Sequence, residues 1–462
     1  METQKIKYLR IFNLKKHSPV KIALFAFLAV GIILILSVLI FLSFPQTYLN
    51  GFLKDRIKDS FAKAYPEYTL KIADVRFNFL KNSIECDSIS LIKSDSSFSC
   101  SINVVSLDGL GWIELLREKG FSPNSITKAV LDVDGIVVNL NQSKDQILCR
   151  RLHLSVPDSD IVIDSLEYHP LITDEQLFAE SKFRNTIYHL AVPGISLNGL
   201  VFRELIIGNS YRARSININD AFITVLVNMD KPYDKKSPNP LMVNEALSSI
   251  MDTIQIDSLQ IMNSRLNYHE RYAVGAKAAL ITFDRMQAVV TGIVNHPDKP
   301  DTLTIHARGN FMNTSAMKLF MSIPLGTQQL SFRYGGTLAK MEVSSLNTFL
   351  EIAEHHRIKS GTLQSAAYNI NVSSGHATGY VNTEYSDLVI AILNKNTGSE
   401  KGIADRISSF IAKTFIIKGS NVRDKSGAMR LGNVKYTRKS DDTFIQFVWF
   451  ALRSGVGNLV GF

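Results

Sequence analysis

Two periodicities of apolar residues divide the chain into elements. Apolar residues recur at every second position, as in a strand with one buried face, through most of residues 68–390. Apolar residues at steps of three and four, typical of an amphipathic helix, occupy residues 47–65 and stop at Pro66. The pattern therefore predicts a mainly β protein with a long antiparallel sheet.

Shorter helical patterns interrupt the predicted strands. They cover residues 111–118, 243–251, 314–322 and 345–357. Residues 229–241 are rich in Pro and Lys and predict an exposed loop. Beyond residue 395, a helical pattern over 402–417 is followed by a basic linker and a final apolar run. That run, which includes Trp449, is predicted to lie at a membrane interface or to close the end of the domain.

An Asp-Ser pair occurs three times at a change of strand phase. The pairs begin at Asp87, Asp164 and Asp257. Around the third, apolar residues shift from even to odd positions, so one residue must be absorbed if a single face is to stay apolar. A β-bulge would absorb it and increase the twist. Repeated bulges predict a sheet curved into a groove.

The Asp-Ser pairs lack the partners that catalysis requires. A serine nucleophile needs a neighbouring base, yet no histidine follows the three pairs at a matching spacing, and no G-x-S-x-G sequence occurs. Glu351 and His355 lie one helical turn apart, but a solvated helix face explains them better than a metal site. We therefore predict no enzyme, no catalytic residue, no metal and no cofactor.

Residues 22–44 predict a membrane anchor. These 23 residues carry no charge and are long enough, as a helix, to span a bilayer. A cleaved signal peptide is the alternative, but its apolar region would be shorter and end in a small-x-small site. Six basic residues precede the segment. They predict a cytoplasmic N-terminus, with the rest of the chain outside the cytoplasm.

Positive charge is concentrated at the two ends of the chain. The net charge is +5 over residues 1–21 and +7 over residues 401–453, against +9 for the whole chain. A folded body without excess positive charge disfavours nucleic-acid binding and favours membrane contact. The chain has three cysteines, too few for a disulfide framework, although Cys86 and Cys100 remain a possible pair on neighbouring strands.

Four segments are informative together: LKDRIKDSFAKAY, YTLKIADVRFNFLKNSIECDSISL, IQIDSLQIMNSRLNYHER and the helix-strand region 335–393. They resemble the AsmA-like family of bacterial envelope proteins, which includes TamB. The resemblance implies a β-groove with an apolar interior, anchored in the inner membrane and exposed to the periplasm. It also implies a role in phospholipid transport or in outer-membrane assembly.

Together, residues and resemblance predict a five-part organisation. The parts are a cytoplasmic tail (1–21), a transmembrane anchor (22–44), an amphipathic helix (45–66), a β-groove domain (67–394) and a basic C-terminal segment (395–462). The expected partners are the membrane, phospholipid and an envelope protein, and not nucleic acid. The expected groove lining is Val75, Phe77, Phe79, Ile254, Ile256, Leu259 and Ile261.

A second set of residues is expected to contact anionic headgroups or a partner protein. This basic patch comprises Lys413, Lys418, Arg423, Lys425, Arg430, Lys435, Arg438 and Lys439, and its alternative is a solvated linker. A different function also remains open: an assembly factor with a closed core could bind partner proteins at its sheet edges. The identity of the lipid, the direction of transport and the oligomeric state are not predicted.

Overall fold

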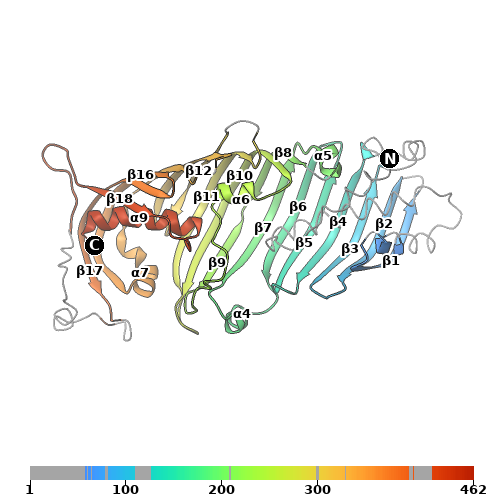
Figure 1. Cartoon of the computed structure of the whole chain (residues 1–462), viewed down its shortest axis with the longest axis horizontal. Helices are drawn as coiled ribbons and strands as arrows, with labels where there is room; N and C mark the ends of the chain where they lie inside the picture. Colours follow the sequence, from blue (N-terminus) through green and yellow to red (C-terminus); the bar gives the residue numbers. More distant parts are fainter. Residues whose placement is uncertain are drawn as a thin grey trace. The chain divides into compact units, whose positions relative to one another are not determined.

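The computed structural model describes residues 58–59, 61–63, 65–78, 82–109, 126–207, 210–297, 301–327, 329–394, 399 and 419–461. The chain forms two compact units, Met1–Ile172 and Thr173–Phe462. Strands dominate both units (Figure 1), so the predicted mainly β class is confirmed. The predicted anchor, residues 22–44, lies outside the described residues. Of the predicted amphipathic helix (45–66), residues 58–59, 61–63 and 65–66 are described; residues 58–59 and 61–63 are helical, and residues 65–66 are not.

The first unit contains an antiparallel meander. Each strand pairs with the next one in sequence. The strands are β1 (Tyr68–Asn78), β2 (Ser83–Lys93), β3 (Phe98–Asp108), β4 (Val130–Leu140), β5 (Asp145–Ser155) and β6 (Asp160–Pro170). Alternation buries one face: on β2 the buried apolar residues are Ile84, Cys86, Ile89 and Leu91. The phase change between Cys86 and Ile89 confirms the shift predicted around Asp87.

A line of residues that the strand register skips crosses all six strands at the level of this shift. Ser88, Gly135 and Ser165 on alternate strands have left-handed backbones, with φ of 50°, 67° and 57°. The register on either side of the line is unchanged, because each neighbouring strand skips one residue at the same level. The predicted bulge, an extra residue on one strand only, is therefore wrong here: the break is matched from strand to strand.

The third Asp-Ser pair lies at a matched break of the same kind. The register skips Asp257 and, at the same level on the two adjacent strands, Arg214 and Gly292. The left-handed residue is Gly292, with φ of 71°, and neither Asp257 nor Ser258 is left-handed. Ser258 stays in register with Thr291, so no bulge occurs at this pair. Register shifts on this strand occur further on, around Ser264.

The second unit contains twelve strands, five α-helices and one 3₁₀ helix among its described residues. Its first part comprises α4 (Asp174–Glu180), β7 (Thr186–Asn198), α5 (Phe202–Ile207), β8 (Ser210–Asn219), β9 (Phe222–Asn228), α6 (Val243–Ser248) and β10 (Thr253–Arg271). Four strands follow: β11 (Ala279–Val294), β12 (Asp301–Phe311), β13 (Ser315–Leu325) and β14 (Phe332–Leu338). The remaining elements are β15 (Met341–Glu342), the 3₁₀ helix η5 (Val343–Leu346), α7 (Asn347–Ala353), β16 (His356–Ser373), β17 (His376–Ile392), β18 (Leu431–Thr437) and α9 (Phe444–Val460).

The sheet of this unit is mostly antiparallel, with one parallel step. β8 and β9 act as a single broken strand, because both pair with β7 on one side and with β10 on the other. Their pairing with β10 is parallel, which the sequence pattern did not predict. A parallel pair needs a crossover connection. Here it consists of residues 229–252, and it carries α6 across the sheet (Figure 1).

Several predicted helices are confirmed and one is wrong. α6 and the η5–α7 pair form where helical patterns were predicted, although α7 ends before His355. Residues 314–322 instead form β13, because pairing with β12 and β14 overrides their local helical preference. The short helices α4 and α5 were not predicted, although Thr173 and Gln176 form a capping box at α4. The predicted helices at 111–118 and 402–417 lie outside the described residues.

Candidate apolar binding surface

Two rows of side chains cross the second unit from β7 to β18. The first apolar row follows directly paired residues: Leu197, Ile216, Leu259, Val290, Ile305, Met321, Tyr334, Ile370, Gly379 and Val434. The second apolar row runs beside it: Ile195, Ile218, Ile261, Ala288, Ala307, Leu319, Gly336, Tyr368, Val381 and Gly432. Directly paired residues share one face of a sheet, so both rows line a single apolar face.

Exposure changes along the first apolar row. From Leu197 on β7 to Ile305 on β12, every member is partly exposed, and we call this the open half. From Met321 on β13 onwards the apolar side chains are buried, with Tyr334 and Ile370 at 0% exposure, and we call this the covered half. One continuous face therefore has a part that solvent reaches and a part that it does not.

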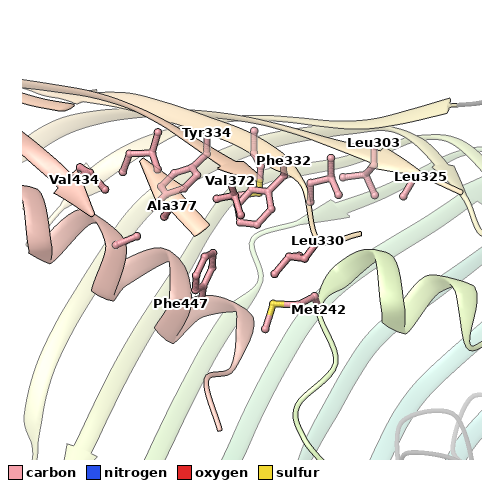
Figure 2. Packing of buried hydrophobic residues seen from close by; sticks show 14 of the residues in the cluster. Met242, Leu303, Leu325, Leu330, Phe332, Tyr334, Val372, Ala377, Val434 and Phe447 are labelled. Carbon is pink, nitrogen blue, oxygen red and sulfur yellow. The ribbon is translucent and has the colours of Figure 1, made fainter. Parts of the chain in front are cut away.

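Two helices form the cover. Phe447 and Ala451 of α9 are fully buried in the same cluster as Tyr334, Ile370 and Val434. Figure 2 shows Phe447 reaching from α9 toward the strands, and Met242 at the start of α6 near Leu330. The Tyr334 hydroxyl donates a hydrogen bond of 2.9 Å to the carbonyl oxygen of Val448, which ties the strand to the helix.

A glycine pair allows α9 to approach the sheet closely. A Cβ atom on Gly432 would lie 2.1 Å from the carbonyl oxygen of Gly455. One on Gly455 would lie 2.6 Å from methyl groups of Val381 and Val434. Gly432 and Gly455, the first glycine of the final GVGNLVG segment, thus have a packing role. They support the view that this segment closes the domain, although Ile445 and Trp449 remain exposed on the outer face of the helix.

α9 also occupies the edge of the sheet. The backbone N–H of Lys435 donates to the Ser454 hydroxyl at 3.1 Å, and that of Asn433 donates to the Asn458 side chain at 2.9 Å. Unpaired edge groups are the part of a strand to which another chain can add. At these two positions of β18, α9 uses the donors that an added strand would need.

The predicted groove residues fall into two environments. Ile254, Ile256, Leu259 and Ile261 are partly exposed on β10, and Leu259 and Ile261 belong to the two apolar rows. Val75 in the first unit is 1% exposed and pairs with the equally buried Cys86. Phe79 lies outside the described residues, and so does the side chain of Phe77. The structure therefore brings together the four residues of β10 as an accessible surface, whereas Val75 of β1 is part of the buried core.

The predicted basic patch is also divided. Arg438 forms an ion pair of 2.9 Å with Glu245 of α6 and donates to the carbonyl oxygen of Pro240, so it stabilises the cover. Arg430 bonds to Asn421 and to the backbone of Ser420. Arg423 lies 3.6 Å from Glu384. Lys425, Lys435 and Lys439 lie among the described residues, whereas Lys413 and Lys418 do not.

The shifted pKa values of the three cysteines and of Glu351 result from burial and from structural contacts. Burial raises the pKa of the Cys86 and Cys100 thiols to about 12 and that of Cys149 to about 11, which makes all three poor nucleophiles. All three cysteines are free. Cys86 and Cys100 do not face each other, because Cys86 pairs with Val105 and Cys100 with Leu91 across β2 and β3. Glu351 bonds to Arg357 at 2.7 Å, and this hydrogen bond holds the pKa of its carboxyl below the usual value.

Among the described residues, no three His, Cys, Asp or Glu side chains are grouped closely enough to hold a metal ion. None of the described helices is both long and apolar enough to cross a membrane.

Comparison with protein-family models gives no match for this chain, and comparison with curated proteins finds no relative. The resemblance to AsmA-like proteins therefore continues to depend on the sequence segments alone.

Proposed function

We propose that the chain is a non-enzymatic, membrane-anchored protein of the bacterial periplasm that binds or conducts phospholipid acyl chains in an apolar β-groove. The supporting observation is the open half of the first apolar row, where five paired strands present partly exposed apolar side chains. A contiguous exposed apolar surface is characteristic of a binding site. The resemblance to AsmA-like proteins favours lipid as the occupant.

In this proposal, the groove ends where the covered half begins. Acyl chains need a continuous apolar surface, and the two rows provide one across β7 to β12. Beyond β13, α6 and α9 already fill the space above the rows with their own side chains. In this proposal, lipid occupies the open half, and the helices determine how far it can extend.

A photoreactive amino acid tests the proposal. Placed at Ile256 of the full chain, in cells, it is expected to form adducts with phospholipid. Gln260 on the same strand is the matched control, because it is exposed but lies on the opposite face from Leu259 and Ile261. Phospholipid adducts at position 256 and none at position 260 are the expected result. Equal adducts at both positions, or none at either, would contradict the proposal.

The alternative function is outer-membrane assembly through partner proteins at the sheet edges. It has less support at β18, where α9 engages the edge donors of Asn433 and Lys435. Protein adducts at position 256 in place of phospholipid would favour this alternative.

A further inference from the structure

A pocket lies on the other face of the sheet from the apolar rows. It has a volume of about 530 Å³ and is lined by residues of β11 to β14, β16 and β17 and of the segment before β18. Lys318 alternates along β13 with Leu319, a member of the second apolar row, so the Lys318 side chain points to the opposite face. Arg308 and Thr337 pair with Lys318 and share its face. We call this site the outer pocket.

The outer pocket has a strong imbalance of charge. Four cationic residues line it, namely Arg285, Arg308, Lys318 and Arg423, and no Asp or Glu does. A bulge on β11 between Asp284 and Gln287 places Arg285 in a left-handed backbone with φ of 48°, and bulges often redirect side chains toward a site. The charges therefore come from three neighbouring strands and one loop.

Two of these cations have no acidic partner. Arg308 donates to the neutral side chain of Gln287 at 2.8 Å, and within the described parts of the chain neither Arg308 nor Lys318 has a carboxylate within salt-bridge distance. The other two are weakly paired: Arg285 lies 3.6 Å from Asp284, and Arg423 lies 3.6 Å from Glu384. Asp284 is mainly engaged by Arg265, at 2.7 Å. An anion could thus bind without displacing a strong ion pair.

The floor of the pocket adds two further features. Small residues, including Gly309, Ala316, Ala339 and Ala367, leave the space open. The side-chain oxygen of Asn382 is buried in the lining and accepts no hydrogen bond from the described protein. A buried acceptor without a donor is unfavourable, so a ligand that supplies a hydroxyl group there would gain binding energy.

We propose that the outer pocket binds a polyol phosphate, in which the phosphate meets Arg308 and Lys318 and a neighbouring hydroxyl donates to Asn382. Arginine and lysine together suit a phosphate, since one presents a planar fork of donors and the other a compact charge. Phosphatidylglycerol headgroups and free sugar phosphates share this chemistry. The site is distinct from the acyl-chain surface, and its existence does not depend on the proposed function.

Titration of the full chain in a non-ionic detergent tests the proposal. The probes are glycerol 1-phosphate, dihexanoyl phosphatidylglycerol and the zwitterionic dihexanoyl phosphatidylcholine. We expect the first two to bind and the third not to bind. Arg308→Gln with Lys318→Gln should weaken binding at least about tenfold, because both charge-assisted contacts are lost. The matched control, Lys235→Gln with Lys236→Gln in the exposed loop, removes equal charge and should leave binding unchanged.

A further variant separates the hydroxyl contact from general charge attraction. Asn382→Ala should weaken glycerol 1-phosphate and leave inorganic phosphate unchanged. Stronger binding of the lipid than of glycerol 1-phosphate would identify a lipid headgroup as the source, and similar binding a free polyol phosphate; both support the site. Equal binding of phosphatidylcholine, or an equal loss in the control variant, would overturn it. Adducts at position 256 are expected in every one of these variants, so failure here is separable from failure of the proposed function.

Discussion

The open and covered halves of the first apolar row are built from the same pattern but have different surroundings. Leu259 in the open half and Tyr334 in the covered half are four pairing steps apart on one face. Leu259 is partly exposed, whereas Tyr334 is completely buried beneath α9. Strand alternation alone thus determines which side of the sheet is apolar. Whether that side becomes a core or a binding surface depends on helices supplied from elsewhere in the sequence.

The first way to sharpen this comparison is to truncate one side chain in each half. Phe447→Ala should lower the free energy of unfolding by about 3–5 kcal/mol, because it leaves a cavity in a fully buried cluster. Leu259→Ala should lower it by only about 1 kcal/mol, because that side chain is already partly hydrated. Urea denaturation followed by Trp449 fluorescence measures both, in a Trp112→Phe background that leaves a single tryptophan. Equal losses would remove the distinction between the halves.

A second variant should convert the covered half into an open one. Gly455→Leu places a side chain against Val381 and Val434, where a Cβ atom alone lies 2.6 Å from their methyl groups. We expect a loss of about 3 kcal/mol and partial separation of α9 from the sheet. Binding of a hydrophobic dye should increase relative to Gly457→Leu, the matched control within the same helix. No increase in dye binding would show that α9 is not what covers the row.

The third comparison concerns the backbone at the border of the open half. Gly292→Ala should destabilise the protein by about 2 kcal/mol or more, because φ is 71° and the new Cβ would lie 2.4 Å from the carbonyl oxygen of Thr302. Asp257→Ala, at the same level on β10, should change stability by less than about 0.5 kcal/mol, since Asp257 is exposed. Thermal denaturation distinguishes the two. A larger effect at Asp257 would give the third Asp-Ser pair a role that its geometry does not explain.

The smallest expected effect concerns the ion pair that joins α6 to the end of β18. Burial raises the pKa of Glu245, but hydrogen bonds from Arg438 and from the backbone N–H of Met242 outweigh it and hold the pKa below its usual value. The resulting stability is present above the unfolded pKa of about 4.5 and is lost as pH falls through the folded value. Arg438→Met should therefore cost about 1–2 kcal/mol at pH 7 and less at pH 3. A loss independent of pH would show that packing, and not charge, joins the two elements.

The strands were more predictable than their surroundings. Alternation at Ile254, Ile256, Leu259 and Ile261 predicts the accessible apolar face of β10, because that signal is local. The cover could not be predicted in the same way, since Phe447 meets Tyr334 across more than one hundred residues. The sequence predicts the phase change at Ser88. It does not predict that the neighbouring strands skip one residue at the same level, because register depends on all the strands that pair.

The outer pocket also could not be predicted from local sequence. Arg285, Arg308 and Lys318 are separate in sequence and ordinary as exposed strand residues. They converge only when β11, β12 and β13 pair in register. The predicted basic patch followed local charge density, and it contributed Arg423 to this pocket and Arg438 to the cover.

The central claim is that one apolar row is open to lipid in one half and closed in the other. A photoreactive amino acid placed singly at Leu259, Ile305, Met321 and Val434 of the full chain tests it most directly, with phospholipid adducts measured by mass spectrometry. Adducts are predicted at Leu259 and Ile305, where the row is partly exposed, and not at Met321 or Val434 beneath the helices. Adducts confined to Met321 and Val434, or equal at all four positions, would contradict the claim.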